Sequence, residues 1–140
     1  MNDTYVLDSF AVLAFLRKEP GGSEVIDILR QASDGGVHVL MSWVNAGEVA
    51  YIVERLSGRP RSNLILGSLE AMPISFIPAD RDLALAAARI KARFALAYAD
   101  AFAAALALKS GGAVLTGDPE FKLLEAEVPI HWIGRAVDRT

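Results

Sequence analysis

The sequence contains no cysteine, and this absence excludes disulfide bonds and thiolate zinc sites. Its two histidines, His38 and His131, are not at the spacing of paired metal ligands, so neither is expected to bind a metal. No apolar run reaches the roughly 18 residues without charge that a membrane helix requires. No basic segment precedes the first apolar residues, as it would in a signal peptide. We therefore expect a cytoplasmic protein without membrane contact.

The chain also lacks an excess of basic residues, because its formal net charge is −3. This balance argues against a general nucleic-acid-binding protein. It does not exclude a nuclease, since an acidic metal pocket lowers the total charge while separate basic residues surround it. Hydrophobic residues make up 53% of the 140 residues, which suggests that a partner covers part of the surface. Without repeats or linkers, the chain is expected to form one domain, residues 1–140.

Short apolar runs alternate with longer segments of helical periodicity, a pattern typical of a parallel sheet between layers of helices. We predict strands at residues 5–7, 37–41, 74–77, 113–115 and 130–133. The first helix is predicted to start near Phe10, and three more have caps: Ser23 for a helix that ends at Gly35, Ser42 for one that ends at residue 57, and Asp80 for one that ends at residue 93. A break at Arg59-Pro60 is predicted to precede a helix over residues 62–71. The last two helices are predicted over residues 98–109 and 120–124. The fold class is α/β, a three-layer α/β/α sandwich whose central, mostly parallel sheet has about five strands.

Four carboxylates occur where a charge is normally costly. Asp8 follows an apolar run, Glu48 lies on an apolar helix face, Asp100 is the only charge between residues 93 and 109, and Asp118 follows another apolar run. Ionised carboxylates are rarely buried without compensation. Because the chain has no cysteine and no paired histidines, a hard divalent cation with oxygen ligands is the expected compensation. The sequence therefore predicts that these residues meet around Mg²⁺ or Mn²⁺.

The predicted topology brings the acids together, because parallel strands all end at the same edge of a sheet. Asp8 and Asp118 follow two strands directly, and the helix that carries Glu48 starts at the end of a third. Asp100 lies near the start of its helix, where the free N–H groups and the helix dipole favour an anion. If the first and fourth strands are neighbours, the two aspartates face each other across the sheet edge.

Each acid also has a purely structural interpretation. Asp8 or Ser9 could cap the first helix, Asp100 could be a first-turn residue, Asp118 could form a turn with the following proline, and Glu48 could be solvated. Aromatic residues have two interpretations as well. Trp43, Phe76 and Phe102 are expected in the core, whereas Phe10, Phe15, Trp43 and Trp132 could instead form an interface.

Four segments, residues 6–13, 45–49, 98–105 and 115–121, together resemble the PIN domain, and most of all the VapC toxins of bacterial type II toxin–antitoxin pairs. The resemblance covers almost the whole chain. It implies that Asp8, Glu48, Asp100 and Asp118 are the acidic quartet that binds the metal and catalyses, with Ser9 and Thr116 as supporting hydroxyls. Glu120 matches an acidic position of many members. Phe10 departs from the small residue that many members have there.

The resemblance also implies a function. The protein would be a Mg²⁺- or Mn²⁺-dependent endoribonuclease that cleaves tRNA or rRNA and arrests translation. It would form a homodimer, be neutralised by a VapB-type antitoxin, and contact DNA only through the antitoxin complex.

Two other classes of function remain open from the sequence. A Mg²⁺-dependent phosphoryl-transfer domain also places an aspartate after its first strand. A phosphatase of the haloacid dehalogenase type needs a second aspartate two residues later, where this chain has Phe10, and Asp3 and Lys122 fit the positions of a receiver domain poorly. The other alternative is a non-catalytic binding module with a PIN-like fold, which the presence of all four acids disfavours.

Overall fold

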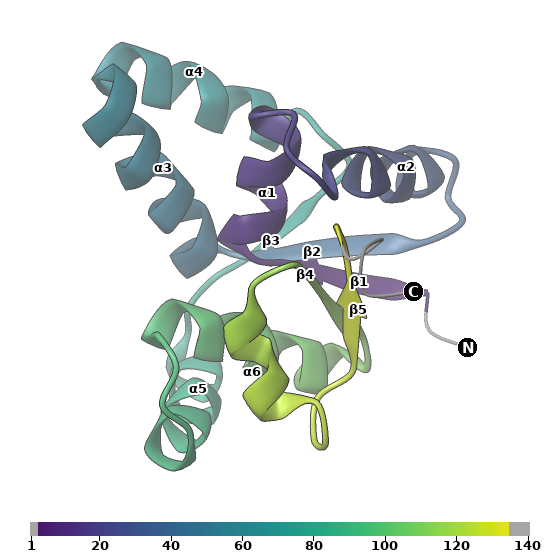
Figure 1. Cartoon of the computed structure of the whole chain (residues 1–140), viewed down its shortest axis with the longest axis vertical. Helices are drawn as coiled ribbons and strands as arrows, with labels where there is room; N and C mark the ends of the chain where they lie inside the picture. The colour runs from purple at the N-terminus through teal and green to yellow at the C-terminus, as the bar shows by residue number, and fades with distance from the viewer. Residues whose placement is uncertain (1–2, 135–140) are drawn as a thin grey trace.

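The sheet of this protein is parallel throughout, as seen in a computed structural model that describes residues 3–134 (Figure 1). Its strands are β1 (Thr4–Leu7), β2 (His38–Ser42), β3 (Ser75–Ile77), β4 (Ala113–Thr116) and β5 (Ile130–Trp132). They lie in the order β3-β2-β1-β4-β5, so β1 and β4 are neighbours. The predicted α/β sandwich with a five-stranded sheet is confirmed. Of the expected domain over 1–140, residues 1–2 and 135–140 lie outside the described residues.

Helices cover both faces of the sheet (Figure 1). One face carries α1 (Ser9–Leu16), α2 (Gly22–Ser33), α3 (Trp43–Ser57) and α4 (Arg59–Glu70), and the other carries α5 (Arg81–Arg93), α6 (Tyr98–Ser110) and the 3₁₀ helix η1 (Pro119–Leu124). Successive side chains of a strand point to opposite faces. The strands β1, β2, β3 and β4 therefore each contribute to both hydrophobic cores, whereas Ile130 and Trp132 of β5 both pack with the core on the side of α5 and α6.

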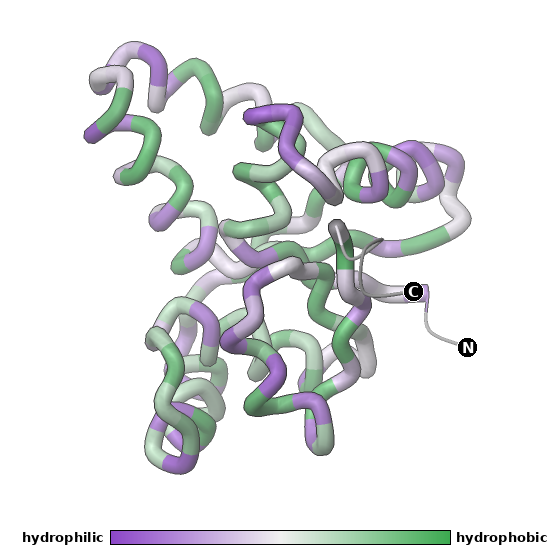
Figure 2. The backbone as a smooth tube through the Cα atoms, viewed as in Figure 1, coloured by the Kyte–Doolittle hydropathy of each residue, from purple (hydrophilic) through white to green (hydrophobic). Residues whose placement is uncertain are grey.

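The division between the two cores follows from residue alternation in the central strands. In β1, Val6 packs with α5 and α6, whereas Leu7 packs with the opposite layer. In β4, Val114 and Leu115 divide in the same way. All four side chains are fully buried, which explains why these strands have continuous apolar sequences. By contrast, α2 alternates between hydrophobic and hydrophilic residues, because only one of its faces is covered (Figure 2).

Most predicted helix ends are confirmed. Ser42 caps α3 by accepting a hydrogen bond from Val44 N, and Asp80 caps α5 by accepting one from Leu83 N. Gly111 ends α6 at a φ of 70°, a left-handed conformation that glycine adopts without steric cost. No helix among residues 3–134 is long and apolar enough to span a membrane.

The predicted cap at Ser23 is wrong, because α2 already begins at Gly22. Its N-cap is Gly21, at a φ of 93°. A Cβ atom at Gly22 would lie 2.7 Å from the carbonyl oxygen of Ala14, so the close packing of α1 against this turn sets the start of the helix. A close approach of two backbones is a tertiary feature that a capping pattern does not reveal.

The predicted break at Arg59-Pro60 is also wrong, because both residues belong to α4. The chain turns one residue earlier, at Gly58, whose φ is 90°. Proline is tolerated in the first turn of a helix, where its missing N–H would have no helical partner. Trp43 is not a core residue either. It is 38% exposed and stacks on the ring of Phe76, with ring centroids 4.8 Å apart, while Phe102 is buried as expected.

Candidate active site

The strand order reverses at β1, and ligand sites in open parallel sheets form at such a reversal. From β1 the chain builds β2 and β3 on one side, and then β4 and β5 on the other. Leu7 pairs with Leu115 in register, so β1 and β4 end at the same edge. Asp8 follows β1 immediately, and Asp118 comes two residues after the end of β4. The crevice beyond these two strand ends is the candidate site.

Asp8 is both a helix cap and a buried carboxylate. Its Oδ1 accepts a hydrogen bond of 2.8 Å from Ala11 N, which caps α1, and its Oδ2 accepts one of 2.5 Å from the Thr116 hydroxyl. Only 1% of the residue is exposed. The Thr116 oxygen in turn accepts a hydrogen bond of 3.0 Å from Asp118 N. Thr116 therefore connects the two aspartates, and the capping interpretation of Asp8 is correct without removing it from the site.

Glu48 reaches the same region from α3. The Ser9 hydroxyl, at the first residue of α1, donates a hydrogen bond of 2.5 Å to Glu48 Oε1 across 39 residues of sequence. Glu48 is half-buried, so the alternative of a fully solvated side chain does not hold. Ser9 and Thr116 thus each orient one carboxylate through a short hydrogen bond.

Asp100 enters from the other side of the sheet, in the first turn of α6. It is 6% exposed and sits in a helix whose next seven residues are all buried. No side chain caps this helix at Ala97, but Ala97 N donates a hydrogen bond of 3.3 Å to Glu120 Oε1. Glu120 N donates to Asp118 Oδ1 at 2.9 Å. Glu120 therefore accepts a hydrogen bond from one backbone N–H at the start of α6.

The electrostatics of the site reflect burial and mutual repulsion. Burial raises the pKa of Asp8 from 3.8 to about 7, helped by the negative charges of Asp118 and Glu48 and opposed by the hydrogen bonds from Thr116 and Ala11. Burial raises the pKa of Asp100 to about 8, and the charges of Asp118, Asp8, Glu48 and Glu120 add to this. Carboxylates from distant segments of the chain therefore raise the pKa values of Asp8 and Asp100 by electrostatic repulsion.

The donors suit a hard cation, but they do not form a closed cage. Among residues 3–134, no group of three or more His, Asp or Glu side chains already stands in position to hold a metal ion. Ser9, Thr116 and Ala11 each donate a hydrogen bond to a carboxylate oxygen of the site. Mg²⁺ keeps several waters and is held by one or two carboxylates. The all-oxygen, charge-crowded site therefore fits a partly hydrated ion of this kind.

Asn45 is a residue of this region that the sequence did not single out. It is fully buried in α3, and its Nδ2 donates a hydrogen bond of 3.0 Å to the carbonyl oxygen of Ala99, just before Asp100. Its Oδ1 is buried without a hydrogen-bond partner among the described residues. Asn45 lies one turn before Glu48, so its amide fixes the helix of Glu48 against the helix of Asp100. An asparagine on a helix face gives no sequence signal for such a contact.

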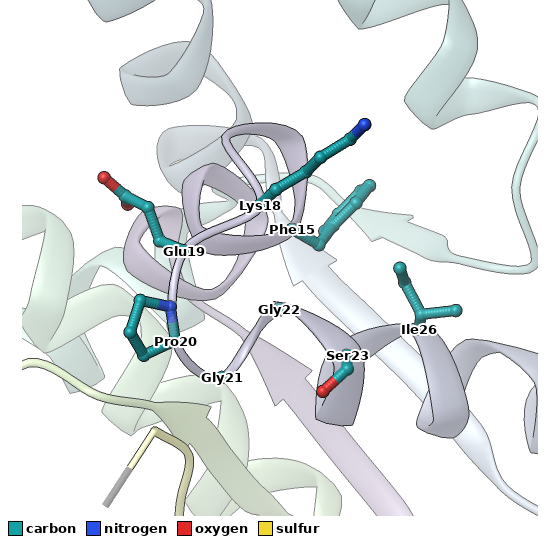
Figure 3. A pocket seen from close by; sticks show the side chains of 8 residues that line it. All are labelled: Phe15, Lys18, Glu19, Pro20, Gly21, Gly22, Ser23 and Ile26. Carbon is teal, nitrogen blue, oxygen red and sulfur yellow. The ribbon is translucent and has the colours of Figure 1, made fainter.

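A separate pocket of about 530 Å³ lies where α1 passes into α2 (Figure 3). Phe15, Ile26 and a tight turn of two glycines line it, and Lys18 and Glu19 are its only charged groups among residues 3–134. None of the four acids lines this pocket. A concave surface alone therefore does not mark the acidic site, which is identified by buried charge at the edge of the sheet.

Comparisons with solved structures agree with this fold. A VapBC2 complex of Rickettsia felis bound to a promoter DNA fragment has a chain with a TM-score of 0.71 at 12% identity, covering 93% of this chain and 98% of that one. A chain of a DNA-bound VapBC of Salmonella typhimurium has a TM-score of 0.71 at 18% identity, and the match covers 94% of this chain and 98% of that one. VapC20 of Mycobacterium tuberculosis, described as a toxin that cleaves the sarcin-ricin loop, has a TM-score of 0.68 at 17% identity, and the match covers 89% of this chain and 95% of that one.

At these identities the solved structures show a common fold. No curated protein is significantly similar to the chain in sequence. The model of one family, however, matches residues 5–127, a range that contains all four acids and both supporting hydroxyls. This chain accordingly belongs to the PIN domain family.

Proposed function

We propose that this chain is a divalent-metal-dependent endoribonuclease, the toxin of a toxin–antitoxin pair, folded as a single domain over residues 1–140. Membership of the PIN domain family and the similarity to VapC toxins support a nuclease. The observation that carries the proposal is the meeting of four carboxylates from distant segments at one edge of the sheet, two with strongly raised pKa values. Structural capping alone does not require two carboxyl groups whose pKa values are raised by burial and further by neighbouring negative charges.

In this proposal Asp8, Asp100 and Asp118 hold the principal Mg²⁺ or Mn²⁺ ion, and Glu48 completes the acidic ring. When bound, such an ion neutralises charge on a phosphodiester and lowers the pKa of water. The chain itself supplies orientation. Thr116 fixes Asp8, Ser9 fixes Glu48, and the buried position of α6 fixes Asp100. Hydrolysis of RNA at this site would leave a 5′-phosphate and a 3′-hydroxyl.

For partners, we propose a VapB-type antitoxin, a homodimer, and DNA contact only through the antitoxin complex. The VapBC complexes with similar chains, two of them bound to DNA, support this arrangement. Apolar side chains at the surface of this chain also support a covering partner, because Leu56 is 69% exposed and Leu64 is 66% exposed. For the substrate, we propose tRNA or rRNA, and the name of VapC20 as a sarcin-ricin loop cleaving toxin is consistent with rRNA.

The test is cleavage by the purified chain with and without Mn²⁺ or Mg²⁺, on total RNA and on a chromogenic phosphate monoester. We expect metal-dependent RNA cleavage, new ends that carry a 5′-phosphate, no monoester hydrolysis, and no activity in the Asp118→Asn variant. Monoester hydrolysis without RNA cleavage would instead support a phosphoryl-transfer domain. Failure to cleave either substrate, with metal bound, would support a binding module and contradict the proposal.

A further inference from the structure

Four residues of α3 form an exposed ridge that starts at the candidate site. Trp43, Gly47, Tyr51 and Arg55 are spaced four residues apart, which places them along one side of the helix. All four are exposed, with Trp43 38% and Tyr51 48% accessible. We call them the α3 ridge. Trp43 follows the end of β2 at the carboxyl edge of the sheet, and α3 projects outward from there (Figure 1).

Gly47 has no structural reason to be glycine. It lies within α3, where glycine destabilises a helix relative to alanine. Its φ is not positive, and a Cβ atom there would meet no atom within 4 Å. Neither backbone conformation nor packing therefore requires it. The next residue is Glu48, whose carboxylate accepts the hydrogen bond from Ser9 in the site. The glycine leaves bare backbone beside that carboxylate, as a closely approaching ligand would require.

Tyr51 and Arg55 form the outer part of the ridge. The Arg55 guanidinium lies 5.0 Å from the centre of the Tyr51 ring. No carboxylate within residues 3–134 pairs with Arg55, whereas Arg93 is held by Glu127 and Arg59 lies 3.6 Å from Glu54. An unpaired guanidinium above an aromatic ring presents a positive charge and a flat surface together. A phosphate group can bind to the positive charge, and an unpaired base can stack on the flat surface.

We propose that the α3 ridge carries the substrate RNA strand, with its bases unpaired, into the acidic site. This inference rests on the proposed endoribonuclease function. Along the helix axis, Arg55 is about 10 Å from Glu48, a distance of roughly three stacked nucleotides. Arg55 then binds a phosphate away from the cleaved bond, Tyr51 stacks a base, and Gly47 admits the strand beside Glu48. The positive charge of Arg55 and the continuity with the acids favour RNA over a protein partner.

The first test uses glycine variants. Gly47→Gln is matched by Gly67→Gln, because Gly67 lies exposed inside α4 and a Cβ atom there also meets nothing within 4 Å. Both changes should raise the melting temperature, since glutamine favours a helix more than glycine. Only Gly47→Gln should weaken binding of a short, unstructured fluorescent oligoribonucleotide, measured by anisotropy in an Asp118→Asn background without cleavage. A stabilised protein that binds RNA less well cannot be explained by damage to the fold.

The second test uses the outer pair. Arg55→Met should lower the slope of log affinity against log salt concentration by about 0.7, the value for one lost phosphate contact on a single strand. Arg89→Met is the matched control, because Arg89 is exposed on α5, has no carboxylate partner in the part of the chain that the structure describes, and should leave the slope unchanged. Tyr51→Leu should weaken the same complex about tenfold without changing the slope. An RNA duplex of the same sequence should bind more weakly than the single strand.

Equal effects of the Gly47 and Gly67 variants, or of the Arg55 and Arg89 variants, would overturn the inference. So would absence of RNA binding, or ridge variants that alter self-association and leave RNA affinity unchanged, since the ridge would then be a protein interface. RNA cleavage without dependence on the ridge would refute this inference alone. Ridge-dependent RNA binding by a protein that never cleaves RNA would support it and refute the proposed function.

Discussion

In the metal-free protein, the free energy of unfolding should decrease as the pH rises from 5 to 8, and Asp8→Asn should reduce this decrease. Burial raises the pKa of Asp8 in the folded chain above its ordinary value. Between the two pKa values the folded state binds more protons than the unfolded state, so stability falls with increasing pH. The stabilisation is complete below the unfolded pKa and is lost as the pH passes the folded one.

The magnitude follows from the shift. The pKa of Asp8 rises from 3.8 to about 7, so most of the loss occurs between pH 5 and pH 7. At 1.36 kcal/mol for each unit, Asp8 should account for about 3 kcal/mol of the stability lost between pH 5 and pH 8. Asp100, with a pKa raised to about 8, contributes in the same direction and should leave a residual decrease in the Asp8→Asn variant.

The assay is urea unfolding in a chelator at pH 5 and pH 8, with Asp80→Asn as the matched control. Asp80 caps α5 as Asp8 caps α1, with a hydrogen bond of 2.9 Å from Leu83 N, but it is exposed. Asparagine caps a helix about as well as aspartate, so neither variant should lose its cap. If Asp8→Asn shows the same pH dependence as the wild-type chain, or if Asp80→Asn reduces it equally, the buried charge is not its cause.

Three further predictions concern the supports of the site. Thr116→Val should weaken Mn²⁺ binding about tenfold in calorimetry, because Asp8 loses its hydroxyl donor, whereas Thr116→Ser should retain the affinity. Gly117→Ala should destabilise the fold by about 1 kcal/mol in urea, since its Cβ would lie 2.5 Å from the ring of the partly exposed Phe10, and Phe10→Ala should rescue part of this loss in a double-mutant cycle. Asn45→Ala should cost about 0.5–1.5 kcal/mol in urea unfolding, because it removes the hydrogen bond between α3 and the carbonyl oxygen of Ala99, and an unchanged stability would mean that the amide is not a support.

The strands could be predicted because they depend on local composition, and one topological rule placed the acids at one sheet edge on the condition that the first and fourth strands are neighbours. Buried parallel strands have continuous apolar sequences, and the ends of β1 and β4 then bring Asp8 and Asp118 to one edge. The errors have a different origin. The start of α2 at Gly22 is set by contact with the backbone of α1, and the exposure of Trp43 depends on how α3 leaves the sheet. Both are tertiary effects that local patterns do not contain.

Within the site, the sequence predicted the chemical type of the supporting residues, but it did not predict their hydrogen-bond partners. The resemblance to the PIN domain implies supporting hydroxyls at Ser9 and Thr116. The structure pairs Ser9 with Glu48 and Thr116 with Asp8, which crosses the sequence neighbourhoods. The contact of Asn45 with the carbonyl group of Ala99 spans 54 residues and has no local signature. Such pairings are decided by the packing of whole helices.

The most direct measurement is the change in melting temperature caused by Mn²⁺ in the wild-type chain, in Asp8→Asn, Asp100→Asn and Asp118→Asn, and in the Asp80→Asn control. A ligand that binds only the folded state stabilises it in proportion to the logarithm of its concentration over its Kd. A shared cation at the β1/β4 edge predicts a clear increase in the wild-type chain and in Asp80→Asn, and a much smaller one in each of the other three. Equal increases in all five proteins would place the ion elsewhere and contradict the account.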